Sequence, residues 1–443
     1  MRIQLSEHFN YRKLIRFVVP SIIMMIFTSV YGVVDGLFVS NFVGKTPFAA
    51  VNLIYPFLML LGAPGFMIGT GGSAIIAKTL GEGDREKANR CFSMLVYITI
   101  AGGVLLTLAG LLWVRPIAEA LGAEGTMVEE CVRYGRIILL AGTAFMLQNT
   151  FQSFLVTAEK PHLGLAVTIA AGLTNILFDA LFVAVFRWGT VGAAAATAMS
   201  QVVGGILPLL YFARPNNSLL RLTRTGLDGK VLLKACTNGS SELMTNVSMS
   251  LVNILYNFQL IRMAGEDGVA AYGVIMYVNF IFVSVFIGYS IGSAPVIGYH
   301  YGAENENELK NLFRKSLILA GLAGLAMTAL AELLSLPLSS IFVGYDAELL
   351  TLTCHGFRLN SLSFLVIGFN IFASAFFTAL NNGVVSAVIS FLRTLVFQII
   401  VVLVLPVFIG VDGIWLSIVV AELLALAVSI WFFLGQRGRY RYA

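Results

Sequence analysis

The feature that most constrains this chain is a series of long apolar stretches that occupies almost its whole length. Hydrophobic residues make up 58% of the 443 residues, and only 12% are charged. A soluble domain has roughly 45–50% apolar and about 25% charged residues, because it must hide its apolar groups from water. A transmembrane helix needs about 20 apolar residues, so this composition provides for roughly a dozen. We therefore predict an all-α polytopic membrane protein, which excludes secreted enzymes, nucleic-acid binders and disulfide scaffolds.

Charged, proline-rich and glycine-rich breaks divide the chain into twelve predicted transmembrane helices. In the first half we place them near 15–41, 48–78, 91–113, 132–157, 162–186 and 190–212. In the second half we place them near 236–263, 269–299, 314–335, 350–379, 384–408 and 412–435. The basic segment 214–235 is the predicted cytoplasmic linker between an N-terminal lobe, 1–213, and a C-terminal lobe, 236–443.

The distribution of cations predicts the orientation in the membrane. If the N-terminus is cytoplasmic and the loops alternate, 21 of the 28 lysine and arginine residues fall on the cytoplasmic side, Arg393 among them. Cytoplasmic loops of membrane proteins carry such an excess. An even number of spans returns the C-terminus to the same side. We expect a multi-pass protein of the plasma (cytoplasmic) membrane, monomeric in the lipid bilayer, with no nucleic-acid partner.

The second half of the sequence repeats the first in one constant register, shifted by half the chain length and with no gap. The matched residues include the glycines, prolines and asparagines that interrupt the apolar stretches. Examples are Gly71 with Gly292, Gly81 with Gly302, Pro116 with Pro337, Asn149 with Asn370, and Gly192 with Gly413. Each half holds six spans, so both insert the same way up. The repeat predicts two six-helix lobes related by a pseudo-twofold axis along the membrane normal, as in many secondary transporters.

Four acidic residues lie deep inside apolar stretches, where a charge costs roughly 2.5–3.5 kcal/mol and marks a functional candidate. They are Asp35, Asp179, Glu242 and Glu422. The four histidines and the four cysteines, which form no Cys-x-x-Cys pair, do not suggest a zinc or haem site, and we expect no cofactor.

Asp35 and Asp179 belong to a predicted cluster in the outer half of the N-terminal lobe. Asn175 and Asp179 are four residues apart and share one helix face. Thr197 follows a run of small residues that allows close helix approach. The repeat does not copy the acids, because Asp35 corresponds to Tyr256 and Asp179 to Ile400. This one-sidedness favours a proton or cation site over polar contacts between helices, and both H⁺ and Na⁺ remain open.

A second set of polar residues is predicted to line a central cavity between the lobes. Glu422 corresponds to Gln201 in the repeat, and an acid there would attract a lipophilic cation. The further cavity candidates are Glu242, Asn149, Asn370, Tyr31 and Tyr256.

Several motifs, in order and spacing, resemble multidrug and toxic compound extrusion (MATE) transporters of the bacterial DinF-like branch. Residues 34–44 (VDGLFVSNFVG) resemble the first helix of that family, and residues 81–88 (GEGDREKA) resemble its first cytoplasmic loop. Asn175 and Asp179, with residues 192–201, resemble the ion site of this branch. Residues 413–417 and 421–423 resemble its last helix.

The resemblance implies a twelve-helix antiporter that exports lipophilic, often cationic drugs in exchange for H⁺ or Na⁺. Asp35, Asn175, Asp179 and Thr197 match the proton or cation site of the family, with Na⁺ at Asp35 and Asp179 as one possibility. The NorM-like branch carries an acid midway along the seventh helix, where this chain reads Leu-Val-Asn at 251–253. A second cation site of that type is therefore not expected.

Two other functions fit the sequence less well than drug export. A lipid-linked oligosaccharide flippase of the same superfamily would favour basic residues in the cavity to hold a pyrophosphate, whereas the candidates here are acidic. An intramembrane enzyme would need an aspartate-rich metal motif or a histidine-centred pair, and neither is found in the sequence. We therefore expect a transporter and not an enzyme.

Overall fold

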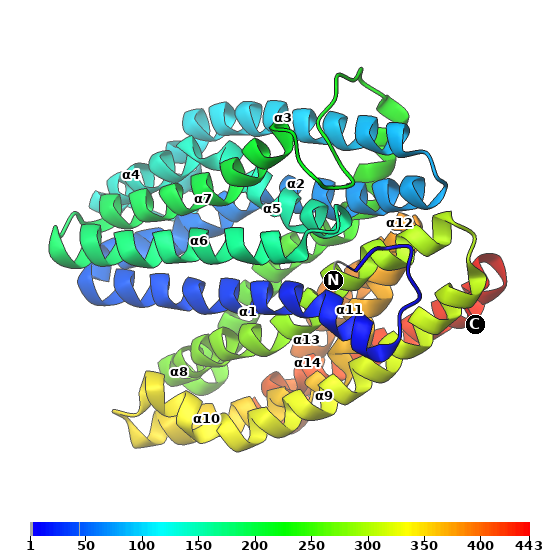
Figure 1. The fold of residues 1–443 in the computed structure, drawn as a ribbon. Helices are drawn as coiled ribbons and strands as arrows, with labels where there is room; N and C mark the ends of the chain where they lie inside the picture. The colour runs from blue at the N-terminus through cyan, green and yellow to red at the C-terminus, as the bar shows by residue number, and fades with distance from the viewer. Residues whose placement is uncertain (1–2, 44) are drawn as a thin grey trace.

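The computed structural model describes residues 3–43 and 45–443, and the elements it assigns there are all helices (Figure 1). The first half contains α1 (Tyr11–Phe42), α2 (Lys45–Gly81), α3 (Arg85–Ala120), α4 (Thr126–Leu140), α5 (Gly142–Thr157), α6 (Pro161–Asp179), the π-helix η1 (Ala180–Val185) and α7 (Gly189–Ala213). The second half contains α8 (Gly229–Gly302), α9 (Glu306–Val343), α10 (Ala347–Ser361), α11 (Phe364–Ala379), α12 (Gly383–Phe391), the π-helix η2 (Leu392–Val396), α13 (Phe397–Ile409) and α14 (Val411–Tyr440).

The predicted twelve-span architecture is confirmed. Among the described residues, nine helices are long and apolar enough to cross a membrane, or ten if α10 and α11, bent by 50°, form one span. The 74-residue α8 is too long for one pass through a core of about 30 Å, and its backbone is non-helical at Gly265. It therefore supplies two antiparallel passes. The 15-residue α4 and the 16-residue α5, broken at Ala141, make the twelfth.

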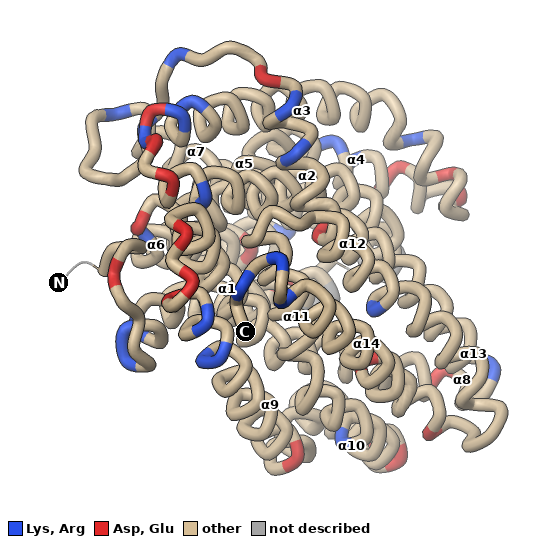
Figure 2. Tube along the Cα trace, turned by 90° about the vertical axis from the view of Figure 1, so that its right-hand side faces the viewer, with Lys and Arg blue, Asp and Glu red and all other residues tan. Residues whose placement is uncertain are grey.

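Some helix boundaries differ from the sequence-based expectation. The predicted span 132–157 is interrupted at Ala141, and the predicted span 350–379 is interrupted between Ser361 and Phe364. The helix predicted over 91–113 extends over Arg85–Ala120, because backbone hydrogen bonding continues beyond the apolar stretch into the polar boundary. Charged residues accordingly gather at helix ends and in connections, while most of the trace between them is uncharged (Figure 2).

The internal repeat is visible in the local backbone conformation. Gly189 and Gly410, which correspond in the repeat, precede or begin matching helices with φ values of 62° and 66°. Asp84 and Asn305 are a second corresponding pair and cap the N-termini of α3 and α9. Each side chain accepts a hydrogen bond from the backbone N–H three residues ahead. The exact boundaries of the lobes and linker stay a prediction, although α7 ends at Ala213 and α8 begins at Gly229.

Glycines allow α2 and α8 to pack closely at the end of the molecule where the segment before α1 and the end of α14 lie (Figure 1). A Cβ atom on Gly71 would overlap the carbonyl oxygen of Ala235, and one on Gly239 would overlap the carbonyl oxygen of Met67. At the opposite end, Gly32 of α1 and Gly273 of α8 have nothing within 4 Å of the position that a Cβ atom would take. The two halves therefore touch backbone to backbone near the segment before α1, whereas further along α1 their contact includes a side chain, the hydroxyl of Tyr277 on α8, 3.6 Å from the Cβ position of Gly36.

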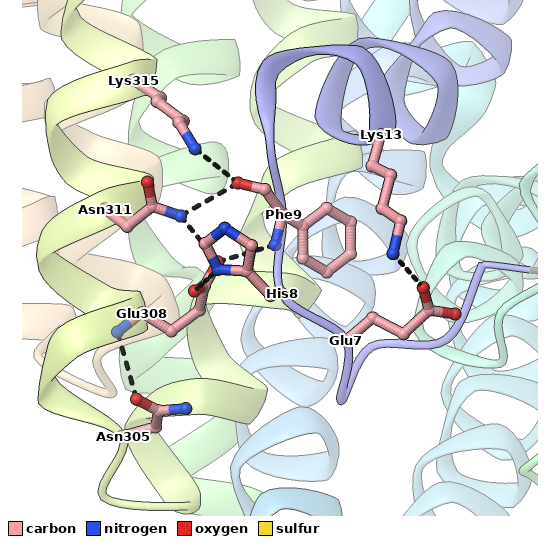
Figure 3. A network of polar contacts seen from close by, with 8 residues as sticks. All are labelled: Glu7, His8, Phe9, Lys13, Asn305, Glu308, Asn311 and Lys315. Carbon is pink, nitrogen blue, oxygen red and sulfur yellow. Dashed lines mark hydrogen bonds and ion pairs between the residues drawn. The ribbon is translucent and has the colours of Figure 1, made fainter.

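The segment before α1 adds a further contact between the two halves at this end (Figure 3). Glu308 of α9 accepts a hydrogen bond from the backbone N–H of Phe9 at 2.9 Å and pairs with Nδ1 of His8 at 2.6 Å. The backbone N–H of Leu5 donates to Glu159, at the end of α5, at 2.7 Å. One short segment therefore holds acidic side chains from both halves. Nearby, the hydrogen bond donated by Lys13 lowers the pKa of Glu7.

Candidate functional site

The structure brings together Asp35 of α1, Asn175 of α6 and Thr197 of α7. The amide nitrogen Nδ2 of Asn175 and the hydroxyl Oγ1 of Thr197 each lie 3.5 Å from Oδ1 of Asp35. Asp35 is half-buried, whereas Asn175 is buried. Two weak donors thus converge on one carboxylate oxygen, from two helices that pack against α1.

Asp179 completes the cluster from the last residue of α6. Its side chain is fully buried, and the charged group that acts on it electrostatically is the carboxylate of Asp35. Among the described residues, no group donates a hydrogen bond to either Asp179 oxygen or to Oδ1 of Asn175. Buried oxygen atoms without a donor are costly unless a proton or a cation compensates them. The cluster is therefore chemically suited to hold H⁺ or a hard cation such as Na⁺, which prefers oxygen ligands.

Local sequence explains why these side chains meet. The glycine and alanines at the start of α7 present little bulk, and a Cβ on Gly192 would lie 3.0 Å from the carbonyl oxygen of Phe182 in η1. This close packing carries Thr197, one turn later, to the side of α1 that bears Asp35. The π-helix η1 begins directly after Asp179. Such wide turns are rare and occur frequently at functional sites.

Glu422 lies in a separate polar network in the second half. Nε of Arg393 donates to its two carboxylate oxygens at 2.8 and 3.0 Å, and Nδ2 of Asn370 donates to Oε2 at 2.7 Å. Ser429 in turn donates to Oδ1 of Asn370 at 2.9 Å. The charge of Glu422 is therefore neutralised within the second half by a guanidinium group.

The prediction that Arg393 lies in a cytoplasmic loop is wrong. Arg393 belongs to η2, about ten residues inside the span that starts at Gly383. At a rise of about 1.5 Å per residue, it lies near the middle of the hydrocarbon core. The signal was present in the sequence, because this arginine falls inside the predicted span 384–408.

The other predicted cavity residues do not gather at one place. Asn149 and Gln201 are buried in the first half, and Tyr31 packs its ring against Gly172 there. Tyr256 is buried in the second half, where its hydroxyl donates to Gln398 at 2.8 Å. Glu242, on the first pass of α8, is partly exposed and interacts electrostatically with Arg393. Of the predicted cavity residues, Glu422 and Asn370 are joined by a direct hydrogen bond at 2.7 Å.

Comparison with known families decides the identity of the fold. The family model MatE matches residues 20–181 and again residues 243–404, which together cover most of the chain. The chain belongs to the MatE family. Its members are the MATE transporters, and the protein is a multi-pass membrane protein of this kind. The two matches fall one in each half, in agreement with the internal repeat.

Individual relatives cover nearly the whole chain at low identity. Proteins named "Multidrug export protein MepA" from Staphylococcus haemolyticus and Staphylococcus saprophyticus are 21% and 23% identical, over 98% and 96% of this chain and 95% and 94% of theirs. A crystal structure of MATE in complex with MaL6 superimposes with a TM-score of 0.92 at 23% identity, covering 97% of both chains. An outward-facing multidrug resistance MATE transporter also gives 0.92, at 23% identity over 97% and 96%.

Proposed function

We propose that the protein is a secondary active antiporter of the plasma membrane that exports lipophilic, often cationic compounds in exchange for H⁺ or Na⁺. The observation that carries this proposal is the Asp35–Asp179 cluster, in which, among the described residues, both buried oxygen atoms of Asp179 lack a protein donor. The names of the relatives, which describe multidrug export, support the substrate class. The segment before α1 and the end of α14 lie at one end of the molecule, which the positive-inside rule makes cytoplasmic.

The mechanism is alternating access controlled by the charge of this cluster. In a conformation open to the outside, Asp35 and Asp179 take up a proton or cation, and their charge is neutralised. Gly36 lies one residue after Asp35, and its Cβ position is 3.6 Å from the hydroxyl of Tyr277 on α8. A rearrangement of α1 at Gly32 or Gly36 therefore reaches the opposite half. The ion shifts the equilibrium because the two conformations bind it with different affinity.

The flippase alternative is less well supported. A pyrophosphate needs uncompensated positive charge, whereas the intramembrane Arg393 already pairs with Glu422 at 2.8 Å. One guanidinium paired in this way does not match a doubly charged lipid diphosphate.

Substitution of the two acids tests the proposal. Asp35→Asn and Asp179→Asn should each abolish ion-driven dye export from proteoliposomes, because neither amide can gain or lose a proton. The control is Glu119→Gln, which removes an exposed acid at the end of α3 and should export normally. Full export by both aspartate variants would refute the assignment.

The same vesicles can identify the coupling ion. Dye efflux is measured under an imposed pH gradient without Na⁺, and under an imposed Na⁺ gradient at equal pH. We expect one of the two gradients to drive export and the double Asp35→Asn, Asp179→Asn variant to respond to neither. Export by wild-type protein with no gradient at all would contradict antiport.

A further inference from the structure

A surface pocket lies where the start of α9 meets the end of α14, outside the proposed ion site. It has a volume of about 440 Å³ and is lined by Glu306, Lys310, Arg437, Gly438, Arg441 and Ala443. Three of the lining side chains are cationic and one is acidic. Figure 2 shows basic positions close to the C-terminal end of the chain. We call this feature the basic pocket, because its side chains carry an excess of positive charge.

The reversal of the chain after α14 builds one side of the basic pocket. Arg441 has a left-handed φ of 52°, and the next side chain, Tyr442, turns back into the core, where it is buried. The hydroxyl of Tyr442 donates to the carbonyl oxygen of Phe433 at 2.8 Å, and its ring centre lies 4.8 Å from that of Phe313 on α9. Nη1 of Arg441 thereby comes within 2.7 Å of Oε1 of Glu306. Core packing therefore determines the shape of the pocket.

The cations of the basic pocket have hydrogen-bond donors that the protein does not use. Among the described residues, the side chains of Lys310 and Arg437 have no ion pair and no hydrogen bond, and both are exposed. Arg441 uses one of its five N–H donors for Glu306. A phosphate oxygen that accepts from several such donors forms charge-assisted hydrogen bonds, which are stronger than neutral ones. The pocket can therefore hold a phosphate through more than one contact.

The basic pocket lies at the depth of lipid headgroups. Lys310 comes four residues before the predicted span 314–335, and Arg437 comes two residues after the predicted span 412–435. At a rise of about 1.5 Å per residue, both Cα atoms lie within about 6 Å of the hydrocarbon. The headgroup layer on each side of a bilayer is about 5–7 Å thick. The pocket is therefore accessible to a lipid phosphate from the side.

An apolar surface continues from the basic pocket into the bilayer. Ile430 and Leu434 lie seven and three residues before Arg437, so they share its face of α14, and both are exposed. Ile318 of α9, about two turns beyond Lys310, is exposed as well. A ligand that fits both surfaces carries an anionic group next to hydrocarbon chains. That combination is the chemistry of an anionic phospholipid, whereas a free anion would use the pocket alone.

We propose that the basic pocket binds the phosphate of an anionic phospholipid in the cytoplasmic leaflet. The phosphate accepts hydrogen bonds from Lys310, Arg437 and the unused donors of Arg441, and the acyl chains lie along Ile430 and Leu434. Cytoplasmic leaflets are rich in anionic lipids, and each nearby lysine or arginine adds to the attraction. Phosphatidylcholine also carries a quaternary ammonium, which the same cations repel. This lipid site is independent of the exported compound and of the coupling ion.

Quenching of tryptophan fluorescence tests the site in vesicles. Trp431 is exposed on α14, six residues before Arg437, and lies beside the proposed acyl chains. Phosphatidylglycerol or phosphatidylcholine with brominated chains is mixed into phosphatidylcholine vesicles. The signal of Trp431 is obtained by subtracting that of Trp431→Phe protein. We expect phosphatidylglycerol to quench at a mole fraction lower by about fivefold or more, the effect of one nearby cation. Equal quenching by both lipids would overturn the proposal.

Charge-matched variants locate the site. The test variant removes the three cations of the basic pocket: Lys310→Gln, Arg437→Gln and Arg441→Gln. The control removes three exposed arginines of the connection between α7 and α8: Arg214→Gln, Arg221→Gln and Arg224→Gln. We expect the test variant to lose the preference for phosphatidylglycerol and the control to keep it. An equal preference in the two variants would indicate general attraction to a basic face and would overturn the assignment to this pocket.

Competition distinguishes a lipid from a free anion. Sodium phosphate is added on both sides of vesicles that contain brominated phosphatidylglycerol, and sodium chloride at equal ionic strength is the reference. The quenching of Trp431 should be the same in both salts, because the lipid chains add to the binding of the headgroup. Loss of quenching in phosphate alone would assign the pocket to a free anion and would overturn the lipid assignment.

Discussion

At the scale of single residues, the two halves differ in how they compensate the charge of acids inside the membrane. The first half places two acids inside the membrane-spanning region without a matching cation, and the second buries an acid that is matched by an arginine. An unpaired acid responds to protons and cations, whereas a paired acid has little reason to change its charge. The residues of the proposed ion site therefore all come from the first half.

Thr197 tests how the first half holds its acid. Its hydroxyl lies 3.5 Å from Oδ1 of Asp35 and is one of two donors to that oxygen. Thr197→Val keeps the shape but removes the donor, so ion-driven export should fall about fivefold, as for a bond worth about 1 kcal/mol. Thr197→Ser keeps the hydroxyl and should retain most of the rate in the same vesicle assay. Equal rates for the valine and serine variants would exclude a role for the hydroxyl.

Arg393 tests the stability of the second half. Arg393→Met alone leaves the carboxylate of Glu422 buried without its cation, and loss of one partner of a buried pair costs about 3–5 kcal/mol. The thermal midpoint in detergent should drop clearly. Adding Glu422→Gln removes the orphaned charge and should recover most of that drop. A double variant no more stable than the single one would show that the pair does not determine stability.

At the scale of elements, α1 and α8 are the parts that connect the halves. The segment before α1 contacts Glu159 in one half and Glu308 in the other, and α2 meets α8 through glycines at the same end (Figures 1 and 3). In the proposed mechanism, opening this end for substrate entry from the cytoplasm breaks both contacts. The N-terminal segment thus links the two halves at this end through hydrogen bonds.

We expect Glu308→Ala to release the N-terminal segment from α9. The carboxylate accepts the backbone N–H of Phe9 at 2.9 Å and pairs with His8 at 2.6 Å, so both contacts are lost. Amide hydrogen exchange in residues 3–10 should accelerate by about tenfold or more, in line with charged hydrogen bonds of about 1.5–3 kcal/mol. Glu348→Ala, at the far end of the molecule, should leave that exchange unchanged. Identical exchange in both variants would mean that Glu308 does not hold the segment.

At the scale of the whole molecule, topology determines which side of the membrane the far end faces. The loop with Tyr345, 83% exposed between α9 and α10, lies at the end opposite the termini. In cells expressing a variant without accessible native cysteine, Tyr345→Cys should react with a membrane-impermeant maleimide. Gly226→Cys, in the connection between α7 and α8, should react only after the cells are opened. The reverse labelling pattern would place the termini outside.

Much of this architecture follows from the sequence because the bilayer imposes strong rules. Apolar stretches of fixed length must form helices, since no water is present to satisfy backbone groups. The constant register between the two parts of the chain predicted two similar halves, and the spacing of Asn175 and Asp179 predicted a shared face. The predicted residues do meet: Asn175 Nδ2 and Thr197 Oγ1 each lie 3.5 Å from Oδ1 of Asp35.

Other features depend on contacts that no local pattern specifies. The sequence shows Glu422 and Arg393 as two charges in separate apolar stretches, and only the packing of η2 against α14 makes them partners at 2.8 Å. It likewise does not indicate that Glu308 pairs with His8, 300 residues earlier in the chain. The sequence by itself determined the membrane-spanning helices, their number and the duplication, because these depend on hydropathy and period. Tertiary structure decided which buried charges are compensated, because compensation depends on where side chains from distant helices meet.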